Sequence, residues 1–389
     1  MTIERNITPK IISLAKKFPV VTITGPRQSG KTTLIKNVFP GKEYFTLEDP
    51  DTRTLIMSDP RGFLELHKKG VVIDEAQLYP ELFSYIQSHV DKHNLAGQVI
   101  LSGSQNFLLL EKISQSLAGR TAVVNLLPFS IEELKDTRFF EKDVNGFILK
   151  GMYPRLYDKK IEPADFYQSY LHTYVERDVR QIKNITNLSL FIKFLKLCAG
   201  RTGQLINLNS LGVECGVSEN TIRSWLSVLE ASFIIYFLQP YHKNFNKRLV
   251  KTPKLYFWDT GLICSLLGIT DKKQLSTHYM RGELFENFVM NDIHKYFYNR
   301  GHQPSCYFWR DKTGHEVDLM VESKGDTAAV EIKSGKTFHV DFLKGLKYIS
   351  GLDKYDIKHS LLIMGSAPKI NTAHTKIVGW DWLKDQKWG

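Results

Sequence analysis

Three apolar stretches in the first hundred residues share one pattern. Each is a short run of aliphatic residues followed at once by glycine, serine or an acid; they lie at 20–24 (VVTIT), 70–77 (GVVIDEAQ) and 98–105 (QVILSGSQ). Continuous apolar strands of this kind are typical of a parallel sheet that helices cover on both faces. Because the carboxyl ends of parallel strands meet at one edge, we expect the polar residues after these strands to converge there.

The loop after the first strand matches G-x-x-x-x-G-K-[ST] and leads into a helix. Glycines let successive N–H groups turn inward around phosphate oxygens, Lys31 reaches the β- and γ-phosphates, and the Thr32 hydroxyl ligates Mg²⁺. The positive end of the following helix adds to the anion site. The sequence therefore predicts binding of ATP with Mg²⁺. The predicted nucleotide contacts are Gly25, Pro26, Arg27, Gln28, Ser29, Gly30, Lys31, Thr32 and Thr33.

The second and third strands end in residues suited to the same chemistry. We expect Asp74 to hold the magnesium ion and Glu75 to polarise the attacking water. Ser104, or Gln105 beside it, stands where a sensor of the γ-phosphate is expected. An ordinary acidic pair at a strand end is the alternative interpretation of Asp74 and Glu75, and the preceding phosphate loop favours the catalytic one.

The middle of the chain has the pattern of a winged helix-turn-helix. A short helix at 209–215 precedes a turn at Gly216, a second helix capped by Ser218, and strands at 233–238 and 254–258. Residues 151–270 hold 15 basic and 9 acidic residues, the largest share of the net charge of +11, which favours nucleic acid as a partner. A role in packing or oligomer contacts remains the alternative. The predicted DNA contacts are Arg223 on the second helix and, in the wing, Lys243, Lys247, Arg248, Lys251 and Lys254.

The last third predicts a helix at 281–297 followed by strands at 306–311, 315–322 and 328–335. An aspartate, Asp318, lies in the second of these strands, and Glu-x-Lys follows in the third. Side chains alternate along a strand, so Glu331 and Lys333 share one face. Glu-x-Lys also occurs on strand faces that only meet solvent, and the upstream aspartate argues for a site.

The order of motifs resembles the AAA+ ATPases, and more narrowly a prokaryotic group of them, over nearly the whole chain. The matching stretches are GPRQSGKTT (25–33), DEAQ (74–77), PFSIEEL (128–134), GMYPR (151–155) and YVERD (174–178). The resemblance implies a homo-oligomeric ring in which an arginine contacts the γ-phosphate bound by the next subunit. Arg120 is the first candidate for that arginine, with Arg177 and Arg180 behind it. An ordinary surface role is the alternative for each.

The last third also resembles the PD-(D/E)xK nucleases. This resemblance implies that Asp318 and Glu331 are Mg²⁺ ligands and that Lys333 is the catalytic lysine. It also implies that Glu286, on the preceding helix, is the extra acid of that fold. Glu316 shares a strand face with Asp318 and is a secondary candidate. The leading proline of the family motif is absent, since residues 315–318 read HEVD.

We therefore predict an α/β chain of three parts: an AAA+ P-loop ATPase domain at 1–150, a helical and winged-helix segment at 151–270, and a small restriction-endonuclease-like domain at 271–389. The leading hypothesis is an ATP hydrolase that acts on DNA through a metal-dependent nuclease-like domain. One alternative is a nucleotide-switched DNA-binding or regulatory protein whose last domain does not cleave. Another is an ATPase that remodels a protein partner.

Composition narrows the class of protein further. The longest apolar run, 231–238, is far shorter than a membrane span, and the amino terminus has no secretory-signal pattern. The four cysteines form no C-x-x-C pair, which predicts reduced thiols instead of a disulfide or zinc framework. We expect a cytoplasmic protein with no membrane partner.

Overall fold

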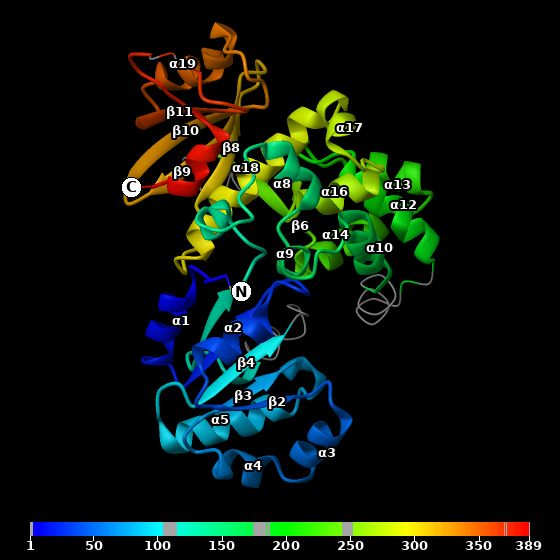
Figure 1. Ribbon diagram of the computed structural model, residues 1–389, viewed down its shortest axis with the longest axis vertical. Coiled ribbons are helices and arrows are strands. Elements are labelled where there is room, and N and C mark those ends of the chain that lie inside the picture. The colour runs from blue at the N-terminus through cyan, green and yellow to red at the C-terminus, as the bar shows by residue number, and fades with distance from the viewer. Residues whose placement is uncertain are drawn as a thin grey trace. The chain divides into compact units, whose positions relative to one another are not determined.

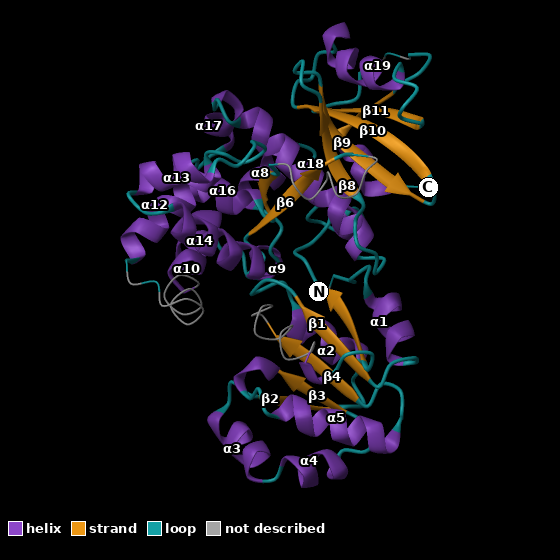
Figure 2. Cartoon of the chain, turned by 180° about the vertical axis from the view of Figure 1, so that it is seen from behind, coloured by secondary structure: helices purple, strands orange, loops and turns teal. Residues whose placement is uncertain are grey.

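The computed structural model describes residues 3–103, 115–173, 185, 187–242, 252–368, 370 and 372–388. They form two compact units, each described here by itself (Figures 1 and 2). The first unit comprises residues 1–129 with 231–233 and 297–302, and the second comprises residues 130–230, 234–296 and 303–389.

A five-stranded sheet forms the centre of the first unit. All of its strand pairs are parallel, in the order β2-β3-β4-β1-β5. The strands are β1 (Val20–Thr24), β2 (Glu43–Thr46), β3 (Val71–Asp74), β4 (Val99–Gly103) and β5 (Thr121–Asn125). The helices are α1 (Thr8–Ala15), α2 (Lys31–Val38), α3 (Pro50–Ser58), α4 (Pro60–Leu66) and α5 (Leu82–His93), with the 3₁₀ turn η1 (Ala76–Leu78).

Alternate residues of these strands enter two separate cores, one on each face of the sheet. Val21 and Ile23 pack with residues of α1 and α2, whereas Val20 packs with residues of α4 and α5. Side-chain alternation along the strands accounts for this division. The predicted parallel α/β sheet with helices on both faces is therefore confirmed.

The second unit contains a seven-stranded mixed sheet in the order β12-β11-β10-β9-β8-β6-β7. Strands β8 to β10 form an antiparallel meander, β11 and β12 add in parallel, and the antiparallel hairpin β6–β7 joins β8 through β6. The strands are β6 (Ile235–Pro240), β7 (Lys254–Phe257), β8 (Cys306–Arg310), β9 (Glu316–Ser323), β10 (Asp326–Lys333), β11 (Ile357–Met364) and β12 (Lys376–Gly379).

The helices of the second unit include the pair predicted for the helix-turn-helix. Gly216 ends the first helix of that pair in the left-handed region, at φ 72°, and the Ser218 hydroxyl accepts a hydrogen bond from the Thr221 amide. The helices are α7 (Ile131–Leu134), α8 (Val144–Lys150), α9 (Pro154–Asp158), α10 (Pro163–Thr173), α12 (Leu188–Ala199), α13 (Leu208–Cys215), α14 (Glu219–Ala231), α16 (Thr260–Leu267), α17 (Lys272–Thr277), α18 (Arg281–Tyr298) and α19 (Lys344–Ser350), with the 3₁₀ turns η3 (Val340–Leu343) and η4 (Trp380–Asp385).

The boundary between the two units lies near residue 130, and the division into three segments stays a prediction. The segment 130–150 belongs to the second unit, where Cys264 of α16 donates a hydrogen bond to the Ile148 carbonyl of α8. The β6–β7 hairpin extends the same sheet as β8 to β12, so the predicted second and third segments share one unit. Across the described residues, no helix is both long enough and apolar enough to cross a membrane.

Candidate functional site

The loop between β1 and α2 has a backbone that only glycine fits at two positions. Gly25 has φ 145°, and a Cβ added there would lie 2.2 Å from the carbonyl oxygen of Leu126. Gly30 has φ 95° and is the residue before the first turn of α2. Both positions are predicted nucleotide contacts, and both glycines are required by the conformation itself.

The side chain of Lys31 lies inside this loop. It is buried, with 6% exposed, and its ammonium donates hydrogen bonds of 2.9 Å and 2.8 Å to the carbonyls of Gly25 and Pro26. Gly30 supplies no capping side chain to the first turn of α2. The loop therefore places a positive charge beside a helix amino terminus that has no acceptor from its cap, an arrangement suited to an anion.

Three hydroxyl groups surround the carboxylate of Asp74 at the end of β3. Thr32 donates a 2.8 Å hydrogen bond to Oδ2, Tyr44 of β2 donates to the same oxygen, and Ser102 of β4 donates to Oδ1. Burial by itself raises the pKa of Asp74, but these hydrogen bonds outweigh it and hold the pKa below its ordinary value. A charged carboxylate next to the Thr32 hydroxyl is the oxygen-donor set that Mg²⁺ prefers.

Glu75 follows Asp74 in a left-handed conformation, with φ 54°. Its Oε2 accepts a hydrogen bond from Nε2 of Gln77, the last residue of the DEAQ stretch. Backbone strain at a residue with a side chain is concentrated at functional sites. The role of Glu75 toward the attacking water stays a prediction.

Arg5 is a residue of this site that the sequence analysis missed. Its guanidinium donates to the Ser29 carbonyl at 2.9 Å and to the Leu127 carbonyl at 2.6 Å, and it lies 4.9 Å from the centre of the Phe129 ring. It therefore ties the phosphate loop to the chain that leaves β5. One arginine before the first helix gives no sequence signal for such a role.

Arg120 lies at the amino end of β5 and is paired within its own chain. Its Nε and Nη2 both donate to the carboxylate of Asp91 on α5. Because β1 and β5 run parallel from Val20 and Thr121, Arg120 lies at the sheet edge opposite to its own phosphate loop. Its role toward a neighbouring subunit stays a prediction. Ser104, Gln105, Arg177 and Arg180 lie outside the described residues.

A second group of charged residues lies in the mixed sheet. Lys333 of β10 contacts the carboxylates of both Glu331 and Asp318, the latter at 3.4 Å. Asp318 of β9 also accepts a 2.8 Å hydrogen bond from the Ile332 amide. Glu286 of α18 lies next to this group, since Lys254 contacts Glu286 at 3.8 Å and also contacts Glu316, two residues before Asp318 on β9. The four residues carried over from the nuclease family are thus brought together.

Glu286, Asp318 and Glu331, here called the acidic cluster, lie close enough together that the negative charge of one disfavours ionisation of the others. Burial and the charge of Asp318 raise the pKa of Glu286 to about 7 and that of Glu331 to about 8. Oε2 of Glu331 is buried without a hydrogen-bond partner. A divalent cation would satisfy this oxygen and offset the repulsion between Glu331 and Asp318, so these two carboxylates suit Mg²⁺.

The prediction that Lys254 contacts DNA phosphates is wrong. This lysine was expected in the wing, facing phosphates, but it is buried on β7, with 5% exposed, and forms ion pairs with Glu316 and Glu286. Glu316, the secondary metal-ligand candidate, is therefore paired with Lys254. Tyr256, two residues along β7, donates a hydrogen bond to Glu286. The positive charge of Lys254 was visible in the sequence, but its burial depends on the pairing of the hairpin with the sheet.

Of the predicted DNA contacts, Arg223 is on α14 and is exposed. It pairs with Glu219 one turn earlier, at 2.8 Å. The others, Lys243, Lys247, Arg248 and Lys251, lie outside the described residues. DNA contact by this region stays a prediction.

Comparison with known proteins gives the family. The chain is 30% identical over 345 residues to the uncharacterized protein Rv2008c of Mycobacterium tuberculosis and, equally, to its Mycobacterium bovis counterpart. The match covers 87% of this chain and 75% of each relative. The chain belongs to their family. An uncharacterized protein of Methanocaldococcus jannaschii is 21% identical over 236 residues, which are 59% of this chain and 48% of that protein.

Family models match three successive parts of this family member. Residues 17–135 match an AAA domain, and residues 141–273 and 281–382 each match a domain of unknown function. The first part is thus a P-loop AAA ATPase domain. Among solved structures, the Walker-type ATPase PABY2304 of Pyrococcus abyssi is 14% identical, with 68% of this chain and 96% of that chain covered and a TM-score of 0.47.

Four residues that contact these two groups were not predicted. Arg5 and Tyr44 belong to segments without a predicted motif, whereas Ser102 and Tyr256 lie on predicted strands at positions to which no role was assigned. Ser102 gave the clearest signal, because it is a small polar residue near the end of an apolar strand. The predicted sensor, Ser104, lies two residues later and outside the described residues, so its role stays a prediction.

Proposed function

We propose that this chain binds ATP with Mg²⁺ and hydrolyses it at the loop between β1 and α2. The observation that supports this most is the position of Asp74, whose buried carboxylate meets the Thr32 hydroxyl at 2.8 Å beside the Lys31 loop. Thr32 and Asp74 would hold the magnesium ion, which neutralises charge on the β- and γ-phosphates.

Other residues of the chain bind the phosphates, orient the water and hold the site in place. Lys31 exchanges its two loop carbonyls for phosphate oxygens, and the first-turn amides of α2 donate to the same phosphates. Glu75 orients the water that attacks the γ-phosphate, and Ser102 and Tyr44 keep Asp74 in place. Arg5 fixes the loop backbone through Ser29.

The Glu75→Gln variant tests the catalytic part of this proposal. Glutamine keeps the shape of the side chain but is a poor acceptor for the water proton, so Mg²⁺-dependent hydrolysis should be lost while ATP binding remains. Equal hydrolysis by the variant and the wild type would remove Glu75 from the mechanism. Absence of hydrolysis by the wild type, with and without DNA, would overturn the ATPase proposal.

We further propose that the ATPase works on DNA and as a homo-oligomer. The basic excess of residues 151–270 and the exposed position of Arg223 on α14 support the first part. The position of Arg120 away from its own phosphate loop is compatible with the second, because an arginine that acts in a neighbouring subunit does not contact the nucleotide of its own subunit. Stimulation of ATP hydrolysis by DNA tests the partner, and stimulation by protein alone would favour remodelling of a protein.

The acidic cluster supports a metal-dependent nuclease activity as a second function. Asp318 and Glu331 would hold Mg²⁺, Glu286 would add a third carboxylate, and Lys333 would orient the nucleophile or stabilise the developing charge. The unpartnered Glu331 oxygen is the observation that favours this. The ion pair of Lys254 with Glu316 favours the rival, a nucleotide-switched DNA-binding protein that does not cleave, since an ammonium already neutralises part of the cluster.

One assay separates these two functions. The full chain is incubated with DNA and RNA substrates and Mg²⁺ or Mn²⁺, and the wild type is compared with Lys333→Ala and Glu331→Gln. Cleavage that both substitutions abolish supports the nuclease. No cleavage under any of these conditions, together with DNA binding that depends on ATP, supports the switch.

A further inference from the structure

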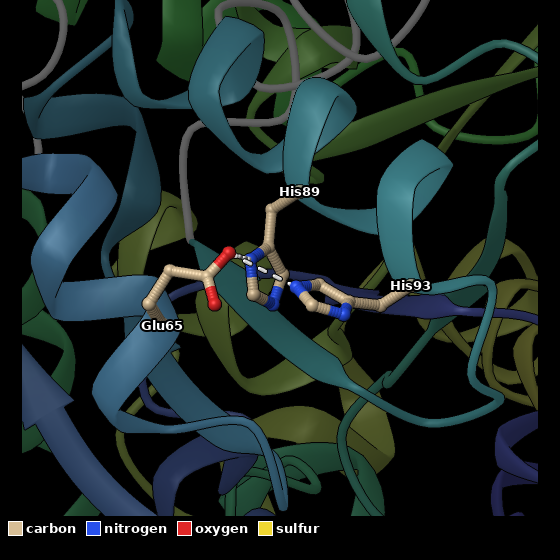
Figure 3. Close-up of side chains that lie close together, drawn as sticks. All are labelled: Glu65, His89 and His93. Carbon is tan, nitrogen blue, oxygen red and sulfur yellow. Dashed lines mark hydrogen bonds and ion pairs between the residues drawn. The ribbon is translucent and has the colours of Figure 1, made fainter.

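Three side chains with metal-binding atoms meet in the first unit, between α4 and α5 and apart from the Lys31 loop. Glu65 is on α4, and His89 and His93 are one turn apart on α5. Oε1 of Glu65 lies 3.0 Å from Nε2 of His93 and 3.8 Å from Nδ1 of His89. Figure 3 shows the carboxylate facing the edges of both rings. All three ligand atoms lie within 4.8 Å of one another.

The buried side chain of Gln98 adds an independent observation. Its Nε2 lies 3.2 Å from Nε2 of His89, while its Oε1 is buried with no hydrogen-bond partner. The two ends of a side-chain amide are assigned from their hydrogen bonds. With the amide turned over, Oε1 accepts a hydrogen bond from Nε2–H of His89, and the orphaned oxygen is satisfied.

That hydrogen bond determines what His89 presents to Glu65. A neutral imidazole carries one proton, so a proton on Nε2 leaves a lone pair on Nδ1. This lone pair then faces a carboxylate oxygen 3.8 Å away, and two acceptors so placed repel each other. A cation between them removes the repulsion. A histidine ligand whose second nitrogen donates to a carbonyl oxygen is the usual arrangement around a protein-bound metal.

We propose that Glu65, His89 and His93 bind a zinc ion. Two imidazoles and one carboxylate form a common three-ligand set for four-coordinate Zn²⁺, and histidines four residues apart on a helix present their nitrogens on one side. Two nitrogen ligands of three disfavour Mg²⁺ and Ca²⁺, which take oxygen ligands. The ion joins α4 to α5, and water takes its fourth position.

Two lysines compete for the same carboxylate. Lys92 lies 2.9 Å from Oε1 of Glu65, and Lys68 lies 3.3 Å from Oε2. The side chains of Lys92 and Lys68 are 65% and 60% exposed, so each can turn into solvent when an ion arrives. Lys92 contacts the oxygen that also faces both histidines, and it is therefore the direct competitor of the ion.

Zinc binding to the metal-free full chain, measured by calorimetry with Mg²⁺ in excess to occupy oxygen-donor sites, tests this proposal. The wild type should bind zinc at this site, and cobalt in its place should show the visible absorption of a four-coordinate ion. His89→Gln and His93→Gln should abolish both signals. The matched control is His359→Gln, because the His359 ring is 68% exposed and lies outside the cluster. Zinc binding that the cluster substitutions leave unchanged, or no zinc binding by the wild type, would overturn the site.

Two further variants leave the three ligands in place, so their effect on zinc affinity can be measured even if the histidine variants fail to fold. Gln98→Leu keeps the buried volume but removes the outer hydrogen bond, and should weaken zinc binding about 10- to 100-fold. Lys92→Gln changes an exposed side chain and should bind zinc more tightly than the wild type. Unchanged affinity in both variants would contradict the proposed place of the ion.

Discussion

Thr32 and Asp74 are joined by a 2.8 Å hydrogen bond, although they belong to different strand–loop units of the sheet. The bond exists because β1 and β3 end at the same edge, on either side of β4. It places a hydroxyl oxygen and a carboxylate oxygen side by side at the mouth of the Lys31 loop. These are the two oxygen donors that would hold the magnesium ion of the proposed nucleotide site.

Substitution of Asp74 tests that arrangement. Asp74→Asn keeps the size of the side chain but removes its charge, and should lower ATP turnover at least about 100-fold, because the metal contribution to such a reaction is several kcal/mol. Tyr44→Phe is the matched control: it removes one hydrogen bond to the same oxygen and should lower turnover less than about 10-fold. Steady-state rates at saturating ATP measure both. Equal losses in the two variants would argue for a structural role of Asp74.

Arg120 gives a prediction about assembly. In a ring, Arg120→Ala should lower turnover about 1,000-fold or more at saturating protein concentration while ATP affinity stays unchanged. Asp91→Asn frees the same arginine from its partner and is the control for loss of the ion pair alone. If Arg120→Ala turns over ATP like the wild type, Arg120 has no role in a neighbouring subunit and only forms its ion pair with Asp91.

Because Lys254 neutralises carboxylates beside the acidic cluster, we expect its substitution to make the stability of the fold depend on divalent metal. Lys254→Met leaves buried carboxylates without their ammonium and should cost about 3–5 kcal/mol of unfolding free energy without divalent metal. Mn²⁺ or Mg²⁺ should restore part of this loss, because a ligand of the native state stabilises it. Urea unfolding with and without metal measures the difference, and Lys254→Arg keeps the charge as a control. A variant that gains no more from metal than the wild type would show that no cation binds there.

Because the His294 ring is buried, we expect the free energy of unfolding to fall as the pH is lowered. Burial lowers the pKa of His294 from 6.5 to about 4, so the neutral ring is favoured in the folded state. Its stabilising contribution is complete above the unfolded pKa and is lost as the pH falls through the folded pKa. Between pH 7 and pH 5 the wild type should lose about 2 kcal/mol more than His294→Phe. Urea unfolding at both pH values checks this, and parallel losses would mean that His294 titrates normally.

How far the sequence predicted these sites depends on whether the information was local. The apolar stretches 20–24, 70–77 and 98–105, and the glycines Gly25 and Gly30, are local patterns, and the structure contains the sheet and loop that they predict. The convergence of Glu286 with Asp318 came from a family resemblance, and in the structure Lys254 bridges Glu286 to Glu316 on the strand of Asp318. The strand order β2-β3-β4-β1-β5 decides which side chains meet, and no local pattern encodes it.

The same reasoning explains the misplaced lysine. Lys254 was grouped with the wing because it is basic and follows other basic residues. Its burial arises because β7 pairs with β6, and β6 in turn pairs with β8, which brings the lysine to acids more than thirty residues away in the chain. Charge along a sequence indicates neither which strands pair nor which charges become buried.

The most direct test of the central claim is a calorimetric titration of the purified full chain with ATP and Mg²⁺, beside the Lys31→Ala variant. The wild type should bind the nucleotide, more weakly without Mg²⁺, and Lys31→Ala should lose this binding because the buried ammonium of the loop is gone. Absence of binding by the wild type, or equal binding by the two proteins, would contradict the assignment of this loop as the nucleotide site.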